Sequence, residues 1–247
     1  KINNKTERGA KMFNLDDTVG NIVTEFPGAA EILKENKIDF CCGGDRELKL
    51  AVKEDLGDDN KAEGILKIIN ENYSEKNDYY QEIEDPKNLS QSQLIEYIVD
   101  KHHGFLRQNL PQLSELTKKI LRAHRENHGQ VLQKVHRLFN TLKMELEEHL
   151  IKEEEEIFPL IKEYSQAESE SQIEDNKILN KILELESEHD TAGDIIKELR
   201  EITDDYKLPE DACNTFKLSY SLLEDLEADL FQHIHLENNI LFARLDK

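Results

Sequence analysis

The chain has 247 residues, of which 53 are acidic and 32 are lysine or arginine, so its formal net charge at neutral pH is −21. This charge repels the phosphate backbone of nucleic acids and anionic membrane surfaces, and no apolar run reaches membrane-spanning length. We therefore expect no nucleic acid and no membrane as partner. Apolar residues make up 37% and charged residues 34%, with no tryptophan, which favours long helices with solvated outer faces.

The three cysteines, Cys41, Cys42 and Cys213, do not form a disulfide framework, because adjacent residues bridge only through a strained ring. This favours a reducing cytoplasm. The lysines near the start are not followed by the apolar core of a secretion signal. Residues 1–11 are polar and precede Met12, so we leave them out of the predicted fold.

Residues 13–73 are predicted to form a small helical domain. Thr18 can cap a short helix over residues 19–26, and Pro27 suits the first turn of the next helix. The glycines at 43 and 44 end that helix and begin another over residues 46–54, and a last amphipathic helix starts near residue 60. A domain of roughly 60 residues has only a modest core.

Residues 74–89 are polar, contain Pro86 and lack apolar periodicity, which predicts a linker. Ser90 and Gln93 then match a capping box that opens a long helix. Three more periodic segments follow near residues 130–164, 173–202 and 209–245, with short polar connections. The predicted fold class is all-α: the small helical domain followed by an up-down-up-down four-helix bundle over residues 90–246.

Two short segments carry a histidine and a glutamate four residues apart, His149 with Glu153 and His233 with Glu237. On an α-helix this spacing leaves both side chains on one face, one turn apart. Each pair lies in an apolar stripe that faces the core, and neither stripe carries a lysine or arginine. A buried carboxylate without a partner costs several kcal/mol, so it is normally paired, protonated or bound to a metal. The pattern predicts two helices that carry metal ligands.

The other two long helices each offer an inward histidine. His189 takes a seam position in the apolar repeat of the third helix, whereas on the first helix either His102 or His103 can face the core. Periodicity alone favours His102 and does not settle the choice. Four imidazoles and two carboxylates are more ligands than one ion takes; zinc prefers four, and magnesium and calcium prefer oxygen. The set therefore predicts two irons or two manganese ions bridged by the glutamates.

Four segments agree in type, order and spacing with one known family: Ile38-Asp-Phe-Cys-Cys-Gly-Gly44, His149 followed by Glu153 and Glu154, Glu188-His189-Asp190, and His233-Ile-His-Leu-Glu237-Asn-Asn239. They resemble the repair of iron centres family, in which a short cysteine-bearing domain precedes a hemerythrin-like di-iron bundle. The resemblance implies His103 rather than His102 as a ligand. It also implies two iron ions per chain, oxo- and carboxylate-bridged, held by His103, His149, Glu153, His189, His233 and Glu237.

The same resemblance implies a cytoplasmic homodimer that helps repair iron-sulfur clusters damaged by nitrosative or oxidative stress. It would act by iron supply or nitric oxide removal, with damaged iron-sulfur proteins as partners. Two other functions stay open: a di-iron reductase of nitric oxide or peroxide, and a non-enzymatic sensor or carrier of oxygen or nitric oxide. Iron transfer, turnover with an electron donor, and reversible ligand binding distinguish the three.

Two of the glutamates outside the ligand set are expected to concern the site. Glu145 lies one turn before His149 and Glu188 is adjacent to His189, so either can orient a ligand or line an entry path. Glu154 is expected to point to solvent, as most residues of glutamate runs do.

The cysteine pair is the second functional candidate. At a helix start, the helix dipole favours the thiolates of Cys41 and Cys42, which suits redox chemistry or the capture of iron or nitrosyl species. Two buried, inert side chains are the alternative interpretation, which the resemblance makes less favoured. Cys213 is predicted to be structural.

Overall fold

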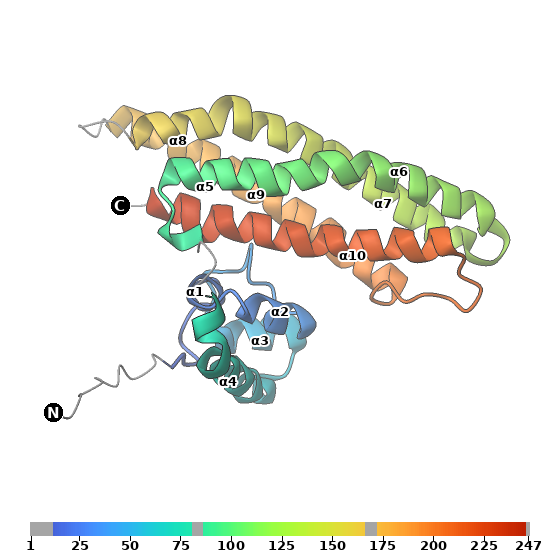
Figure 1. Cartoon of the computed structure of the whole chain (residues 1–247), viewed down its shortest axis with the longest axis horizontal. Coiled ribbons are helices and arrows are strands. Elements are labelled where there is room, and N and C mark those ends of the chain that lie inside the picture. Colours follow the sequence, from blue (N-terminus) through green and yellow to red (C-terminus); the bar gives the residue numbers. More distant parts are fainter. Residues whose placement is uncertain (1–11, 81–85, 166–171, 246–247) are drawn as a thin grey trace. The chain divides into compact units, whose positions relative to one another are not determined.

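The computed structural model describes residues 12–80, 86–165 and 172–245. Residues 1–11, residues 81–85 of the predicted linker, and residues 166–171 and 246 of the predicted bundle lie outside these ranges. The chain divides into two compact units, Lys1–Asn88 and Leu89–Lys247. Regular secondary structure in the described residues is helical, which confirms the predicted all-α class (Figure 1). Within these ranges, no helix combines the length and the apolar character needed to cross a membrane.

The amino-terminal unit is built from α1 (Val19–Glu25), α2 (Ala29–Glu35), α3 (Leu48–Leu56), η1 (Asp59–Lys61), α4 (Ala62–Tyr80) and η2 (Pro86–Asn88). The hydroxyl oxygen of Thr18 accepts a hydrogen bond from the backbone N–H of Asn21 and caps α1, as predicted. The last helix continues to Tyr80, into the segment whose composition predicted a linker.

Helix α3 begins later than the glycine pair suggested. The backbone N–H of Val19 donates to the carbonyl of Arg46, and that of Leu48 donates to the carbonyl of Asp17. These two bonds hold Glu47 in an extended conformation, opposite Thr18, so the helix starts only at Leu48. The cysteine pair therefore lies in a loop rather than beside a helix start.

Apolar side chains from the four α-helices form the core of this unit, among them Ile22, Leu33, Val52 and Ile69, all fully buried. Asn70 in α4 exchanges two hydrogen bonds with the backbone of Phe13, at 2.9 and 3.0 Å. This exchange satisfies polar groups that the core would otherwise leave without partners, and it fixes the entry of the chain against α4.

The second unit is a bundle of four rods, where a rod is a run of consecutive helical elements (Figure 1). The first two comprise α5 (Gln91–Ile98), η3 (Val99–His103) and α6 (Gly104–Ala123), then α7 (Arg125–Lys152), η4 (Glu153–Ile157) and α8 (Phe158–Tyr164). The last two comprise α9 (Gln172–Thr203), then α10 (Asn214–His235), η5 (Leu236–Leu241) and η6 (Phe242–Arg244). Helix α6 packs against α7 and α10, and α7 packs against α9.

The rod boundaries follow local sequence signals. Ser90 and Gln93 form the predicted capping box at the start of α5. His124 alone separates α6 from α7, so these two helices are antiparallel neighbours. An apolar cluster that includes Ile98, Ile157 and Leu241 fills the end of the bundle formed by α5, α8 and η5.

Three of the rods contain a π-helical turn: η3, η4 and η5. Each turn contains one of the predicted ligands, His103, Glu153 or Glu237. A π turn is wider than an α turn, so neighbouring side chains depart from the 3.6-residue wheel, and such turns are frequent at functional sites. Both His102 and His103 are consequently buried, whereas the regular helical period placed only His102 near the centre of the apolar stripe.

Candidate metal centre

Six side chains from the four rods meet in the bundle interior and form two groups of four. The first group is His103, Glu153, His233 and Glu237, and the second is His149, Glu153, His189 and Glu237. In each group, one nitrogen or oxygen from every residue lies within 4.8 Å of the others. All six residues are buried, and the two glutamates belong to both groups.

In the first group the imidazole nitrogens and carboxylate oxygens converge closely. Nε2 of His103 lies 3.2 Å from Nε2 of His233 and 3.3 Å from Oε2 of Glu153. Nε2 of His233 lies 3.0 Å from Oε1 of Glu237. The i, i+4 spacing in α10 and η5 therefore places a histidine and a glutamate side by side, as the sequence pattern required.

The second group repeats this arrangement with the remaining oxygens. Nε2 of His149 lies 3.0 Å from Nε2 of His189 and 3.3 Å from Oε1 of Glu153. Nε2 of His189 lies 3.2 Å from Oε2 of Glu237. Each glutamate thus turns one carboxylate oxygen to each group, which is the disposition a carboxylate needs to bridge two cations.

In the second group, the opposite ring nitrogens of the two histidines face hydrogen-bond partners outside the two groups. Nδ1 of His149 lies 2.7 Å from Oε2 of Glu188, and Nδ1 of His189 lies 2.9 Å from Oδ1 of Asn238. An imidazole that donates its Nδ1–H presents a lone pair at Nε2. Two such lone pairs only 3.0 Å apart repel each other unless a proton or a cation lies between them.

Glu154 corrects the expectation that it points to solvent. One of its oxygens lies 2.5 Å from Nδ1 of His103 and 2.6 Å from a guanidinium nitrogen of Arg107. It follows Glu153 in the π turn η4, whose geometry a regular α wheel does not describe. Asn238, in η5, is a second residue whose orienting role the sequence did not reveal, because its contact with His189 joins two different rods.

The electrostatics of the centre require positive charge among the ligands. Burial lowers the pKa of His149, but the carboxylates of Glu153 and Glu188 raise it more, to about 10. The hydrogen bond with His149 lowers the pKa of Glu188 to about 2. Burial raises the pKa of Glu237, yet His233 and His189 hold it well below its ordinary value.

A metal cation fits this donor set. Both oxygens of Glu153 and Oε2 of Glu237 are buried and accept no hydrogen bond in normal geometry from the described residues. The ion pairs of these two glutamates in that part of the chain are with histidines. The ammonium group of Lys152, which precedes Glu153 in the chain, binds Glu188 at 2.6 Å. Buried carboxylates in this situation are stabilised by a bound cation.

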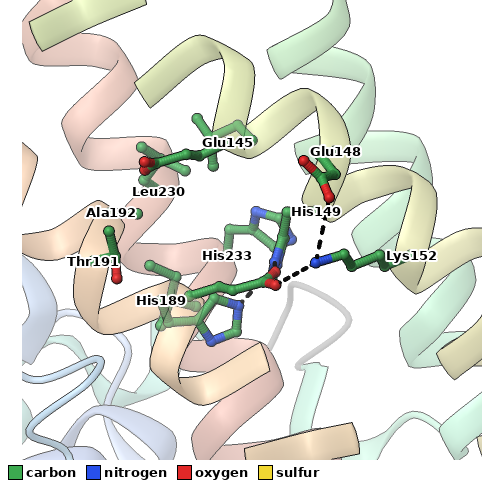
Figure 2. Close-up of a pocket in the computed structure, with 12 residues that line it drawn as sticks. Glu145, Glu148, His149, Lys152, His189, Thr191, Ala192, Leu230 and His233 are labelled. Atoms are coloured by element: carbon green, nitrogen blue, oxygen red, sulfur yellow. Dashed lines mark hydrogen bonds and ion pairs between the residues drawn. The ribbon is translucent and has the colours of Figure 1, made fainter. Parts of the chain in front are cut away.

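A cavity of about 230 Å³ opens beside the second group (Figure 2). It reaches His149, His189 and His233, and Glu145 and Glu188 contribute to its wall. Both glutamates predicted around the site line the cavity, and Glu188 also contacts His149, a ligand candidate.

His102 is buried but belongs to neither group. Its Nδ1 lies 2.9 Å from Oδ1 of Asp229, and its ring stacks on that of His233 with centroids 5.5 Å apart and planes 6° from parallel. Burial lowers the pKa of His102. Of the two histidines that the sequence pattern left open, the structure places His103 among the ligand candidates and His102 beside them.

The cysteine pair lies in the loop between α2 and α3. Cys41 is buried, Cys42 is partly exposed, and their sulfur atoms are 3.9 Å apart. The contact with Cys42 and burial raise the pKa of the Cys41 thiol well above its ordinary value. The prediction that a helix dipole stabilises the thiolate of Cys41 is therefore wrong, because the next helix begins only at Leu48.

Comparison with known proteins agrees with this architecture. Residues 94–245 match the Hemerythrin HHE cation binding domain family, and residues 15–61 match Domain of Unknown function (DUF542). The chain is 31% identical over 234 residues to the iron-sulfur cluster repair protein ScdA of Staphylococcus epidermidis, covering 95% of this chain and 100% of that protein.

Two further relatives come from other bacteria. The iron-sulfur cluster repair protein YtfE of Pectobacterium atrosepticum is 32% identical over 234 residues, covering 93% of this chain and 96% of that protein. The probable iron-sulfur cluster repair protein of Haemophilus influenzae is 32% identical over 229 residues, covering 92% and 95%. These matches confirm the resemblance drawn from the motifs: the chain belongs to the hemerythrin HHE family and, within it, to the iron-sulfur cluster repair proteins.

Proposed function

We propose that the bundle holds two iron ions, one in each group of four side chains, bridged by Glu153, Glu237 and an oxo ligand. The division of each carboxylate between the two groups supports the bridging role. The donor set is imidazole and carboxylate without sulfur, which suits iron or manganese better than magnesium or calcium. When bound, such ions supply redox chemistry and open positions for small ligands.

The chain acts, on this proposal, in the repair of iron-sulfur clusters damaged by nitrosative or oxidative stress. The observation that supports this proposal is the two buried groups of candidate metal ligands, which share Glu153 and Glu237. The relatives that align with more than nine tenths of this chain are named for cluster repair. Damaged iron-sulfur proteins are the proposed partners, and the chain either supplies them with iron or removes nitric oxide from them.

The cavity favours a second candidate, a di-iron reductase of nitric oxide or peroxide. It gives a small molecule a route to His149, His189 and His233 without any change in the bundle. The same route serves a non-enzymatic sensor or carrier of oxygen or nitric oxide. Turnover with an electron donor separates the reductase from the carrier.

Two further features belong to the proposal. Cys41 and Cys42 handle redox equivalents, iron or nitrosyl species. Cys41, Cys42 and Cys213 form no disulfide bond, which supports a reducing cytoplasm as the compartment. The homodimer remains a prediction that rests on the family resemblance.

Iron content and iron transfer test the proposal. The full chain, purified from iron-replete cells, is expected to contain about two irons and to show oxo-bridge absorption. Mixed with a cluster-free iron-sulfur enzyme and sulfide, it restores that enzyme's activity while its own iron content falls. Glu153→Gln with Glu237→Gln removes both bridges and abolishes the transfer, whereas Glu147→Gln, at an exposed position of α7 outside the cavity wall, leaves it intact.

The outcomes separate the candidates. Steady consumption of nitric oxide with an electron donor, and no recovery of the acceptor enzyme, replaces repair by a reductase. Reversible oxygen or nitric oxide binding with neither result marks a sensor or carrier. A full chain that retains no iron after purification and reconstitution contradicts the di-iron centre itself.

A further inference from the structure

Three side chains of the α2–α3 loop form a compact group with no part in the bundle site. One carboxylate oxygen of Asp39 and the sulfur atoms of Cys41 and Cys42 all lie within 4.8 Å of one another. The sulfur of Cys41 lies 3.2 Å from Oδ1 of Asp39 and 3.9 Å from the sulfur of Cys42.

The separation of the sulfurs is informative. A disulfide bond would bring them to about 2.05 Å. Two thiolates on one tetrahedral ion, each at about 2.3 Å, lie about 3.8 Å apart. The sulfurs of Cys41 and Cys42, at 3.9 Å, are thus already spaced as two ligands of a single cation.

The loop that carries the group is fixed by bonds to its backbone. Oδ1 of Asp39 accepts hydrogen bonds from the backbone N–H groups of Cys41 and Gly43, at 3.1 and 3.3 Å. The backbone N–H of Asp39 donates to a carboxylate oxygen of Asp55 at 2.9 Å. Because these bonds set the loop conformation, the donor atoms need little rearrangement to bind an ion.

Arg46 closes the other side of the loop. Its guanidinium donates to the carbonyls of Asp39 and Gly43, at 3.1 and 3.2 Å. It also makes two bonds to Asp55, at 2.8 and 2.9 Å, and one to Glu54 at 3.1 Å. Arg46 therefore binds the backbone of the loop and anchors it to Asp55 and Glu54.

We propose that Asp39, Cys41 and Cys42 form a second cation site, for a thiophilic divalent ion such as Fe²⁺ or Zn²⁺. Two sulfurs and one oxygen leave the fourth tetrahedral position to water or to a ligand from outside. Cys42 and Asp39 are partly exposed, so that position is open to solvent. Binding releases the two thiol protons and forms two metal–sulfur bonds, with no change of oxidation state.

This inference specifies what Cys41 and Cys42 bind, namely a divalent cation. Only the biological role of that binding rests on the proposed function. The site belongs to the amino-terminal unit and shares no residue with the bundle groups. Each site can therefore be tested while the other is left unchanged.

Cobalt is the probe, because a cobalt–thiolate bond absorbs strongly in the near ultraviolet by sulfur-to-metal charge transfer, whereas imidazole and carboxylate ligands do not. The full chain, loaded with iron in its bundle and kept reduced, is titrated with Co²⁺ under anaerobic conditions and followed by difference spectra. We expect the charge-transfer band to saturate at one Co²⁺ per chain.

Three variants locate the band. Cys42→Ser removes one sulfur from a half-buried position and is expected to reduce the band by at least half. Asp39→Asn keeps the amide oxygen that accepts from the loop backbone, so the loop stays formed while Co²⁺ binding weakens about tenfold or more. Cys213→Ser is the control, because it removes the cysteine of the other unit and leaves the band unchanged.

The results have definite readings. No charge-transfer band in the reduced wild-type chain, or a band that persists in Cys42→Ser and disappears in Cys213→Ser, overturns the inference. Circular dichroism and an unchanged iron content in each variant show that both units are folded. A cobalt band in a chain whose bundle holds no iron would leave this inference standing and contradict only the proposed di-iron centre.

Discussion

Nδ1 of His149 donates a hydrogen bond to a carboxylate oxygen of Glu188 at 2.7 Å, across the interface between α7 and α9. The other oxygen of Glu188 binds the ammonium group of Lys152 at 2.6 Å. The low pKa of Glu188, about 2, keeps it charged throughout the physiological pH range. The hydrogen bond with Glu188 thereby holds the ring of His149 with Nε2 toward the other candidate ligands of the second group. It also makes Nε2 a better donor to a metal.

Replacing Glu188 should weaken metal binding although Glu188 contacts no metal. Glu188→Leu is expected to lower iron affinity by about 10- to 100-fold, and Glu188→Gln by less, because the amide oxygen still accepts from His149. Competition with a chelator measures the affinity. Glu184→Gln is the matched control. Native Glu184 also pairs with Lys152, at 3.7 Å, but has no contact with His149 in the described residues. Equal losses in both glutamine variants would contradict the orienting role.

The two neighbouring histidines of η3 should respond differently to substitution. His103→Phe removes Nε2 from the first group and is expected to lower the iron content from about two per chain toward one. His102→Phe retains a ring that can stack on His233 and should leave the iron content unchanged. Elemental analysis of both purified variants decides between them. A greater loss in the His102 variant would reverse the assignment.

Gly43 is required by the close approach of Arg46. A Cβ at this position would lie 2.4 to 2.7 Å from three guanidinium atoms, which are anchored to Asp55. Gly43→Ala should therefore lower the free energy of unfolding of the amino-terminal unit by about 1–3 kcal/mol. Urea unfolding followed by circular dichroism measures this quantity.

Gly64→Ala is the matched control for that experiment. Gly64 lies in α4, and a Cβ there meets no atom within 4 Å. The substitution should raise the free energy of unfolding by about 0.5–1 kcal/mol, because alanine favours the helix. If Gly43→Ala is as harmless as Gly64→Ala, Arg46 moves aside at little cost and the packing argument fails.

Cys213 should react at lower pH than an ordinary thiol. Its sulfur lies 3.3 Å from Nε2 of His124, and with the backbone N–H groups at the start of α10 this lowers the pKa to about 7. Only the thiolate is alkylated, so the rate with iodoacetamide should rise through pH 7 and level off above pH 8, whereas an unperturbed thiol near 8.5 continues to gain. Peptide mass spectrometry measures the rate at Cys213.

The contact with His124 can be tested by the same labelling. In His124→Gln the midpoint of the pH profile should move up toward that of a free thiol, while Cys41, whose pKa is raised by Cys42 and burial, stays unreactive near neutral pH in both proteins. An unchanged midpoint in His124→Gln would assign the shift to the helix start alone. The expectation that Cys213 is merely structural does not account for its exposure or its low pKa.

Much of the site could be predicted from the spacing of residues within single helices. A histidine and a glutamate four residues apart, inside an apolar stripe, must enter the core together, because helix geometry puts them on one face. His149, Glu153, His233 and Glu237 therefore needed no structure to be recognised as a set. The four-rod architecture followed in the same way from apolar periodicity, the capping box at Ser90 and the short connections.

What the sequence could not determine depends on contacts between rods and on departures from the regular helix. The π turn of η3 buries both His102 and His103, so only the position of the facing rods separates them. Glu154 binds His103 from another rod, and the loop around Cys41 is held by bonds from Arg46 and Asp55.

The sequence by itself thus determined which helix faces turn inward and which ligand types they carry, because both depend on the period of one helix. Only the tertiary structure decided how each carboxylate divides its oxygens between two cation groups, which residues orient the imidazoles, and where the cysteine thiols lie. These features are set by distances between residues far apart in the chain, and a one-dimensional pattern does not contain them.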